Sequence, residues 1–223
     1  MLLPAAVRLL AAPLARLLYR PVIEGRENVP PDGPVILAAN HLSFIDSVVI
    51  PLVAPRPVAF LAKDEYFRRR GLKGRLLRAA FTALGAVPVE RGGHRAARQA
   101  LETARQVLAQ GKAFGIYPEG SRSRDGRLHR GRTGVAWLAF ASGAPVVPVA
   151  LLGTDRVQPV GARLPRPRRV TVRFGRPLRF APDDPAARGA RARREATDEI
   201  MKAIQELSGQ ELSGAYNDPP LAA

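Results

Sequence analysis

The sequence predicts a single α/β domain in which a mainly parallel or mixed sheet is flanked by helices. Short apolar runs that indicate buried strands alternate along the chain with longer segments whose apolar residues recur at helical spacing. The 223 residues are enough for one domain with a sizeable core, and the sequence contains no internal repeat or long linker. We expect the domain to span residues 21–207, between an N-terminal segment at 1–20 and a flexible tail at 208–223.

Each element is expected where its composition favours it. Strands are predicted where apolar residues cluster between turn signals, at 35–39, 58–62, 85–91, 113–117, 145–151 and 170–174. Helices are predicted from Asp46 to just before Pro51, and at 67–84, 95–110, 133–142 and 186–207. Turn-forming residues dominate 21–33, and the tail holds little apolar surface, so we expect a loop in the first and a loose chain in the second.

The composition indicates which partners and which chemistry are compatible with the chain. Lys and Arg number 35 against 19 Asp and Glu, and the net charge of +16 indicates an anionic partner: nucleic acid, an anionic membrane surface or a phosphorylated substrate. The chain has no cysteine, which excludes disulfides, thiolate catalysis and cysteine-based zinc sites, and its three histidines do not favour a metal site. We therefore expect no metal and a location on the cytoplasmic side.

The N-terminal segment, Met1 to Arg20, has an interfacial pattern. Prolines and arginines interrupt it, so no apolar run reaches the roughly 20 residues that cross a bilayer. On a helical wheel most leucines fall to one side, while Arg8, Arg16 and Arg20 share the other. This pattern predicts an amphipathic helix on a membrane surface, the alternative being a helix packed on the protein's own core. The basic segment 67–84 is a second candidate for anionic headgroups, or else a solvated helix face.

The stretch from Asn40 to Asp46 follows the strand predicted at 35–39, at a position where α/β folds place their chemistry. Asp46 lies five residues after His41, so it can reach one imidazole nitrogen and leave the other to face a substrate. The chain has no cysteine and no Gly-x-Ser-x-Gly motif, so a base acting directly on a substrate hydroxyl is simpler than a covalent nucleophile. The alternative is a hydrogen-bonded histidine with a structural role only.

Cations follow two other predicted strands. Lys63 comes directly after the strand at 58–62, and Arg91 ends the strand at 85–91. If the strand at 58–62 runs parallel to 35–39, Lys63 faces the edge of the sheet that carries His41. Lys63 is then a candidate partner for a phosphate, although a solvated lysine in a turn is an equally simple explanation.

The loop after the strand at 113–117 combines several groups that bind phosphate. Gly120 allows a sharp turn or a close approach to a ligand, Ser121 offers a hydroxyl, and Arg122 or Arg124 can hold a phosphate through two parallel hydrogen bonds. Glu119 would repel a phosphate, so we expect it to orient an arginine or to accept a substrate hydroxyl. A polar surface loop without a ligand is the alternative.

Four blocks together carry a family resemblance: Asn40-His41-x4-Asp46, Gly-Ala-Val-Pro-Val-Glu-Arg at 85–91, Tyr-Pro-Glu-Gly-Ser-Arg-Ser at 117–123 and Ala-Pro-Val-Val-Pro-Val-Ala at 144–150. In this order and spacing the chain resembles the glycerolipid acyltransferase family over roughly residues 33–155. The resemblance implies transfer of an acyl chain from acyl-CoA or acyl carrier protein to the free hydroxyl of a lysophospholipid, typically lysophosphatidic acid. It implies neither a metal nor a covalent acyl-enzyme.

The resemblance also implies roles for individual residues. His41 is similar to the general base and Asp46 to the carboxylate that fixes its tautomer. The residues similar to those that hold the glycerol phosphate are Glu119, Gly120, Ser121 and Arg122, with Arg91 matching a basic residue of the second block and Lys63 a family lysine. Ser121, Tyr117 and Phe44 are conservative departures from the family pattern, whereas Gly131 replaces an aromatic and leaves the acyl-chain or acceptor preference open.

Three alternatives to lysophosphatidic acid acylation follow from the sequence. An acyltransferase for another lysolipid would keep the same chemistry with less phosphate charge to bind. A nucleic-acid-binding protein is disfavoured because aromatic residues make up only 6% of the chain and are not interleaved with the arginines. A lipid carrier without catalysis would leave the pairing of His41 with Asp46 unexplained. We expect an enzyme attached peripherally or monotopically to the cytoplasmic face of the cell membrane.

Overall fold

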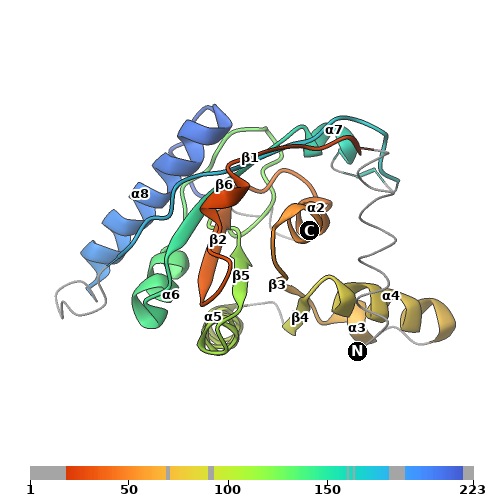
Figure 1. Ribbon diagram of the computed structural model, residues 1–223, viewed down its shortest axis with the longest axis horizontal. Helices are drawn as coiled ribbons and strands as arrows, with labels where there is room; N and C mark the ends of the chain where they lie inside the picture. The colour runs from red at the N-terminus through yellow and green to blue at the C-terminus, as the bar shows by residue number, and fades with distance from the viewer. Residues whose placement is uncertain are drawn as a thin grey trace.

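The computed structural model describes residues 19–68, 71–89, 93–159, 161–162, 164–180 and 189–217. Within these residues seven strands form one sheet in the order β1-β7-β6-β2-β5-β3-β4 (Figure 1). The strands are β1 (Val22–Glu24), β2 (Val35–Ala39), β3 (Val58–Lys63), β4 (Ala86–Val89), β5 (Ala113–Ile116), β6 (Val146–Leu152) and β7 (Thr171–Phe174). The helices are α2 (Asp46–Val53), α3 (Glu65–Arg68), α4 (Gly71–Ala83), α5 (Gly93–Ala109), α6 (Gly134–Ser142), α7 (Thr154–Val157) and α8 (Ala190–Ser208), with a 3₁₀ turn η1 at Arg26–Asn28.

The sheet is mixed and mainly parallel, which confirms the predicted fold class. Strands β6, β2, β5, β3 and β4 run parallel to one another, and only the pairing of β6 with β7 is antiparallel. In the register of β2 and β5, Val35 lies opposite Ala113 and Ala38 opposite Ile116. The residues that follow these two strands therefore emerge side by side at one edge of the sheet, where parallel sheets place their ligands.

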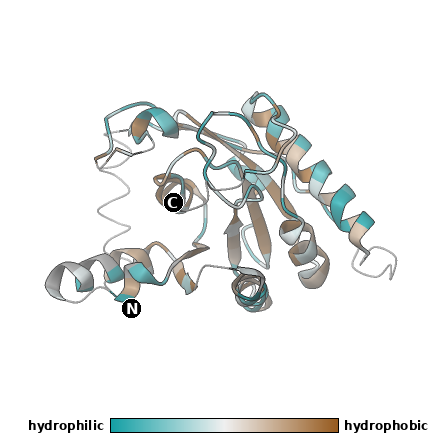
Figure 2. Ribbon diagram, turned by 180° about the vertical axis from the view of Figure 1, so that it is seen from behind, coloured by the Kyte–Doolittle hydropathy of each residue, from teal (hydrophilic) through white to brown (hydrophobic). Residues whose placement is uncertain are grey.

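Alternate residues of β2 enter two hydrophobic layers. Val35 and Leu37 belong to the layer shared with α2, whereas Ile36 and Ala38 belong to the layer shared with α5, α6 and α8. All of these side chains are fully buried, because a central parallel strand is covered on both faces. Figure 1 shows α5, α6 and α8 on one side of the sheet and α2 on the other, and Figure 2 shows apolar strands between them.

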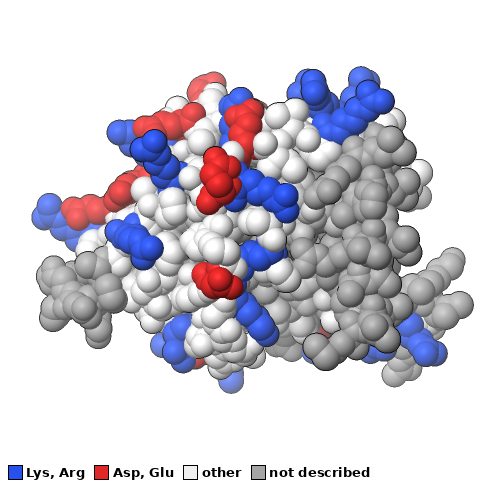
Figure 3. All heavy atoms as spheres, viewed as in Figure 1, with Lys and Arg blue, Asp and Glu red and all other residues white. Residues whose placement is uncertain are grey.

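The outer face of α8 carries paired charges. Ion pairs at helical spacing join Arg191 to Glu195, Arg194 to Asp198 and Lys202 to Glu206. Figure 3 shows positive and negative side chains interleaved on this side of the molecule. Such exposed pairs contribute little to stability. They do show that the excess of positive charge in the chain does not come from this helix face.

The structure differs from the expected elements at four places. Val22–Glu24 forms the edge strand β1 beside β7, within a segment expected to be a loop, because three residues are too short to give a strand pattern. Helix α2 continues through Pro51 to Val53, since burial of its apolar face outweighs one missing helical hydrogen bond. The helix expected at 67–84 is two helices, α3 and α4. Helix α8 begins at Ala190, after a stretch, 181–188, outside the described residues.

The described part of the predicted tail, residues 209–217, is hydrogen-bonded to the rest of the domain. Residues 209–217 make hydrogen bonds to loops that lie about 85 to 170 positions earlier in the chain, and composition does not report such partners. The N-terminal segment predicted to lie on a membrane falls almost entirely outside the described residues, since the structure begins at Tyr19. In the part of the chain that the structure covers, no helix is both long and apolar enough to cross a bilayer.

Candidate active site

His41 and Asp46 form the predicted pair at the carboxyl end of β2. The Nδ1 atom of His41 lies 2.9 Å from Oδ2 of Asp46, whose side chain is fully buried, and 15% of the imidazole is exposed. The same oxygen accepts the backbone N–H groups of Leu42 at 2.7 Å and Ser43 at 2.8 Å. An oxygen that receives three donors is held as an acceptor, so Nδ1 carries the hydrogen and Nε2 is left with its lone pair.

Asp46 is also the first residue of α2. A carboxylate at a helix N-terminus is stabilised by the helix dipole and by nearby N–H groups. The turn that returns the chain from β2 to α2 therefore places the Asp46 carboxyl group beside His41. His41 is also tied to the loop between β5 and α6, because its carbonyl accepts the N–H of Ser123 at 2.7 Å.

Tyr117, the residue after β5, packs flat against the His41 imidazole. The two rings lie 3.9 Å apart with an interplanar angle of 10°. The Tyr117 hydroxyl lies 3.0 Å from Oγ of Ser47, and burial together with the charge of Asp46 raises the pKa of Tyr117 well above its usual range. Tyr117 therefore remains neutral and fixes the plane of the imidazole. The sequence placed Tyr117 in a family block without assigning it a role.

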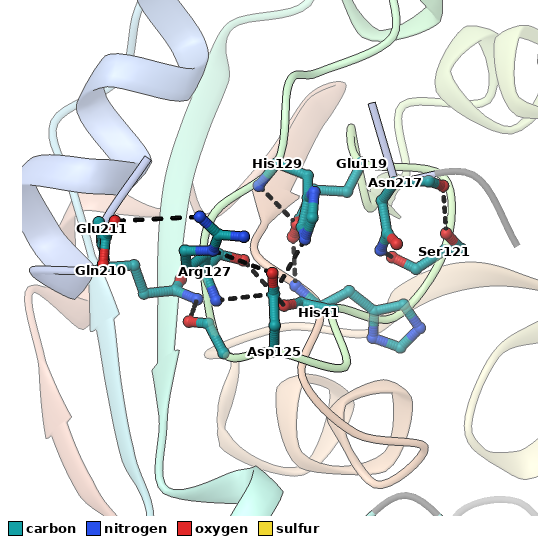
Figure 4. A network of polar contacts seen from close by, with 11 residues as sticks. His41, Glu119, Ser121, Asp125, Arg127, His129, Gln210, Glu211 and Asn217 are labelled. Atoms are coloured by element: carbon teal, nitrogen blue, oxygen red, sulfur yellow. Dashed lines mark hydrogen bonds and ion pairs between the residues drawn. The ribbon is translucent and has the colours of Figure 1, made fainter. Parts of the chain in front are cut away.

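Glu119 lies between two backbone N–H donors. Its side chain is fully buried, Oε1 accepts the backbone N–H of His41 at 3.0 Å, and Oε2 accepts the backbone N–H of His129 at 3.0 Å (Figure 4). Each oxygen thus accepts a main-chain donor, and Glu119 links the His41 turn to the loop at residue 129. Burial raises the pKa of Glu119 to about 7, although the two N–H groups work to lower it.

Asp125 organises the rest of this loop. One of its oxygens accepts hydrogen bonds from Oγ of Ser123, the N–H of Arg127 and Nε2 of His129, and the other accepts Nε of Arg127 (Figure 4). Partial burial acts to raise the pKa of Asp125, but these hydrogen bonds outweigh it and hold the pKa of that carboxyl below its usual range. The loop between β5 and α6 is therefore a structured element.

A cavity of about 160 Å³ opens beside His41. It is lined largely by apolar and aromatic side chains, Phe44, Val48, Phe60, Leu61, Phe81 and Leu84, together with the polar groups of His41, Ser47 and Arg122. The structure therefore brings Arg122 to the same hollow as the imidazole. Arg124 does not line this cavity, which distinguishes the two arginines that the sequence left as equal candidates.

The remaining predicted binding residues fall in different places. Gly120 has a left-handed backbone with φ of +81°, and its N–H closes a turn onto the Tyr117 carbonyl at 3.0 Å. Ser121 bonds to the C-terminal segment and is not directed to the cavity by any of these contacts. Lys63 is the last residue of β3, which pairs in parallel with β5, the neighbour of β2. Only the backbone of Lys63 is described, and Arg91 lies outside the described residues.

Four backbone N–H groups at and near His41 are already hydrogen-bonded within the protein. The N–H of His41 is bonded to Glu119, those of Leu42 and Ser43 to Asp46, and that of Gly120 to Tyr117. Each of these four N–H groups therefore already has an acceptor within the protein, and these bonds fix the turns on either side of the His41 imidazole.

Asn40 is a site residue whose contribution the sequence did not reveal. It is fully buried, and it exchanges two hydrogen bonds with the backbone of Leu151, one to the carbonyl at 2.9 Å and one from the N–H at 2.7 Å. These bonds join the end of β2 to β6. The only sequence signal was the polar residue directly after an apolar strand.

Gly131 has a packing role. It is buried, and a Cβ at this position would lie 2.7 Å from Cγ of Met201 on α8. The C-terminal helix thus occupies the space into which a larger side chain at 131 would extend. Contact with Met201 therefore accounts for the glycine at 131, a position at which the glycerolipid acyltransferase family usually has an aromatic residue.

The fold and the site define a class of protein: an α/β domain in which a histidine, oriented by a buried aspartate, lies beside a largely apolar cavity at the carboxyl edge of a mainly parallel sheet. Residues 20–152 match the protein-family model described as Acyltransferase. This match covers more than half of the chain, and the chain belongs to that family.

Similar proteins of known name agree with this assignment. The chain is 32% identical over 145 residues to a chloroplastic 1-acyl-sn-glycerol-3-phosphate acyltransferase of Brassica napus, covering 65% of this chain and 40% of that protein. It is 34% identical over 156 residues to a 1-acyl-sn-glycerol-3-phosphate acyltransferase of Chlamydomonas reinhardtii, covering 69% and 45%. The chain thus spans less than half the length of these relatives.

A solved structure shares the fold. The crystal structure of the 1-acyl-sn-glycerophosphate (LPA) acyltransferase PlsC from Thermotoga maritima is similar with a TM-score of 0.64 and 26% sequence identity. The similarity covers 91% of this chain and 82% of that chain. It therefore extends beyond the segment matched by the family model.

Proposed function

We propose that this protein transfers a fatty acyl chain from an acyl thioester, acyl-CoA or acyl carrier protein, to the free hydroxyl of 1-acyl-glycerol-3-phosphate, giving phosphatidic acid. One observation carries the proposal: the His41 imidazole, oriented by Asp46, faces a cavity that is apolar on most of its wall and has Arg122 on its polar side. An amphiphile with an acyl chain and a phosphate matches this distribution.

The reaction follows from the geometry of His41. Its Nδ1–H is donated to Asp46, so Nε2 accepts the proton of the lysolipid hydroxyl as that oxygen attacks the thioester carbonyl carbon. The new C–O bond gives a tetrahedral oxyanion, and its collapse breaks the C–S bond. The leaving thiolate then takes the proton back from the imidazolium, which Asp46 stabilises while it exists. No metal and no acyl-enzyme enter this scheme.

The cavity supports the substrate class by its size and lining. A dry cavity of roughly 150 Å³ holds a benzene-sized group, so the 160 Å³ beside His41 fits the first carbons of an acyl chain next to the reacting carbonyl. Arg122 adds a planar guanidinium that binds phosphate through two parallel hydrogen bonds. Lys63 and Arg91 are proposed as additional cations for that phosphate, as the family resemblance implies.

The names of the relatives support the same acceptor. The plant and algal relatives are named 1-acyl-sn-glycerol-3-phosphate acyltransferases, and so is a protein of Borreliella burgdorferi that is 28% identical over 134 residues, covering 60% of this chain and 52% of that protein. We further propose that the protein works at the cytoplasmic face of the cell membrane. The amphipathic pattern of residues 1–20 and the basic segment at 67–84 would bind anionic headgroups there.

The test is acyl transfer from labelled acyl-CoA by purified protein in mixed micelles, with lysophosphatidic acid offered beside lysophosphatidylcholine. We expect labelled phosphatidic acid, and we expect His41→Ala to abolish it while the fold is retained. Product from lysophosphatidylcholine alone would keep the chemistry and overturn the acceptor. If no product forms with acyl-CoA, the same assay with acyl carrier protein as donor decides, and failure of both donors would sink the proposal.

Arg122 and Arg124 provide a matched pair for the phosphate site. Both side chains are exposed and they lie two residues apart, but only Arg122 lines the cavity. Arg122→Ala should raise the KM for lysophosphatidic acid about tenfold or more, because a charge-assisted hydrogen bond is worth roughly 1.5–3 kcal/mol. Arg124→Ala should leave that KM unchanged. An effect of Arg122→Ala on the acyl donor alone would refute the phosphate role.

A further inference from the structure

The segment that follows α8 has contacts that the proposed reaction does not use. Residues 209–217, here called the C-terminal strap, leave the helix at Gly209, which has a left-handed backbone with φ of +67°. The strap lies outside residues 20–152 that match the family model. It nevertheless contacts Asn40, the residue before His41, and the loop that carries Arg122.

The strap pairs with the loop between β5 and α6 through its backbone. The N–H of Leu128 donates to Glu211 at 2.8 Å, the N–H of Ser213 donates to Leu128 at 2.9 Å, and the N–H of Arg130 donates to Ala215 at 2.8 Å. This pattern is that of a short parallel bridge, centred on Leu128 and Leu212. The strap thus pairs with this loop as a neighbouring β-strand would.

The beginning of the strap contacts the base side of the site. Oε1 of Gln210 accepts a hydrogen bond from Nδ2 of Asn40 at 2.7 Å, and Nε2 of Gln210 donates to the Gly126 carbonyl at 2.7 Å. Asn40 directly precedes His41 and is fully buried. Gln210 therefore joins the turn that carries the base to the Arg122 loop.

The end of the strap contacts the phosphate side. Oγ of Ser121 donates to the Asn217 carbonyl at 2.8 Å, and Nδ2 of Asn217 donates to the Ser121 carbonyl at 3.1 Å (Figure 4). This reciprocal pair fixes the backbone one residue before Arg122. The neighbouring ring of Tyr216 adds cation–π contacts, with the guanidinium carbons of Arg130 and Arg132 at 5.3 Å and 5.5 Å from its centroid.

We propose that the C-terminal strap positions the two halves of the active site separately: Gln210 positions His41 through Asn40, and Asn217 positions Arg122 through Ser121. This inference rests on the function proposed above. Gln210 and Asn217 are positioning residues, since they act through their neighbours and neither of them lines the cavity beside His41. The two ends of one strap should therefore affect different kinetic constants.

The kinetic test uses the full chain and compares Asn217→Ala with Gln210→Ala. A net hydrogen bond is worth about 1 kcal/mol, so Asn217→Ala should raise the KM for lysophosphatidic acid roughly fivefold to tenfold and leave kcat within about twofold. Gln210→Ala should lower kcat roughly fivefold to tenfold and leave that KM within about twofold. The KM for the acyl donor should change with neither.

Conservative variants separate positioning from a loss of fold. Ser121→Thr keeps the hydroxyl that donates to the Asn217 carbonyl and should raise the KM for the acceptor less than Ser121→Ala does. Glu211→Gln is the control on the strap itself, because its side chain is exposed and meets only Arg127 at 4.0 Å among the described residues. It should match the wild type in both constants.

The outcomes distinguish this inference from the proposed function. A wild-type protein inactive on lysophosphatidic acid would overturn the function, and this inference with it. Two results with an active wild type would overturn the positioning role of the strap alone. In the first, the Asn217→Ala and Gln210→Ala variants have the same kcat and KM as Glu211→Gln. In the second, both variants show a lower kcat and a higher KM together, in proportion to a lower melting temperature. A higher acceptor KM in Asn217→Ala together with a lower kcat in Gln210→Ala, each with the other constant unchanged, would establish the positioning role.

Discussion

The substitution Asp46→Asn tests how the carboxylate serves the base. In the native protein Oδ2 receives three donors: Nδ1 of His41 and the N–H groups of Leu42 and Ser43. An asparagine at 46 would place its carbonyl oxygen there, because its NH₂ group would otherwise face two backbone donors at 2.7 and 2.8 Å. The His41 tautomer is then retained and the negative charge is removed, while the NH₂ group takes the buried position of Oδ1, which has no hydrogen-bond partner among the described residues.

The size of the effect follows from the distance. A carboxylate and an imidazolium about 4 Å apart interact by about 4 kcal/mol at an effective dielectric constant of 20, so removal of the charge should lower kcat roughly a thousandfold. Asp46→Ala should be worse in two respects. It loses the charge and also leaves two buried N–H groups without an acceptor, which costs about 1–3 kcal/mol of stability for each group.

The assay is single-turnover acyl transfer to lysophosphatidic acid, together with urea unfolding of each variant. We expect Asp46→Asn to fold with near-native stability and to lose most of its kcat with little change in the acceptor KM. Retention of more than a fifth of the native kcat would refute the argument that Asp46 stabilises an imidazolium. Equal losses of kcat and stability in the Asn and Ala variants would show that Asp46 serves the backbone and not the base.

Three further predictions follow from the site and the core. Because burial raises the pKa of Glu119 from 4.5 to about 7, the folded state holds a proton that the unfolded state releases, and stability should fall by about 3 kcal/mol as the pH rises from 4.5 through 7. Glu119→Gln should lack this dependence of stability on pH. The free energy of unfolding of both proteins is measured by denaturant at several pH values, and the same pH dependence in Glu119→Gln and in the wild type would contradict the raised pKa of Glu119. Gly115→Ala should destabilise the protein by about 1–3 kcal/mol, because the new Cβ would lie 2.0 Å from the Phe60 ring, and Phe60→Leu in the same chain should recover part of the loss in thermal unfolding. Tyr117→Phe keeps the ring on His41 and should lower kcat by less than about threefold, whereas Tyr117→Leu removes the stacking and should cost up to about tenfold; equal kcat values in the two variants would exclude a role for the ring.

The fold was predictable because its central strands are buried on both faces. The sequences of such strands are uninterrupted apolar runs. The runs that predict β2, β5 and β6 agree with the bounds of these strands to within a residue or two. Strand β1 was missed because its three residues pair at an edge and are only partly buried. The continuation of α2 through Pro51 was missed because local propensity opposes it, and only packing against the sheet decides it.

The sequence by itself determined that a histidine and an aspartate follow a buried strand at a spacing suited to a base and its partner, and that a loop with Gly120 and Arg122 follows another. This is local information, carried by residue type and by neighbours a few positions apart. The tertiary structure decided what each group contacts: the burial of Glu119 between two backbone donors, the stacking of Tyr117 on His41, and the reach of residues 209–217 to both sides of the site. These contacts join segments up to 170 residues apart, and no local pattern specifies such partners.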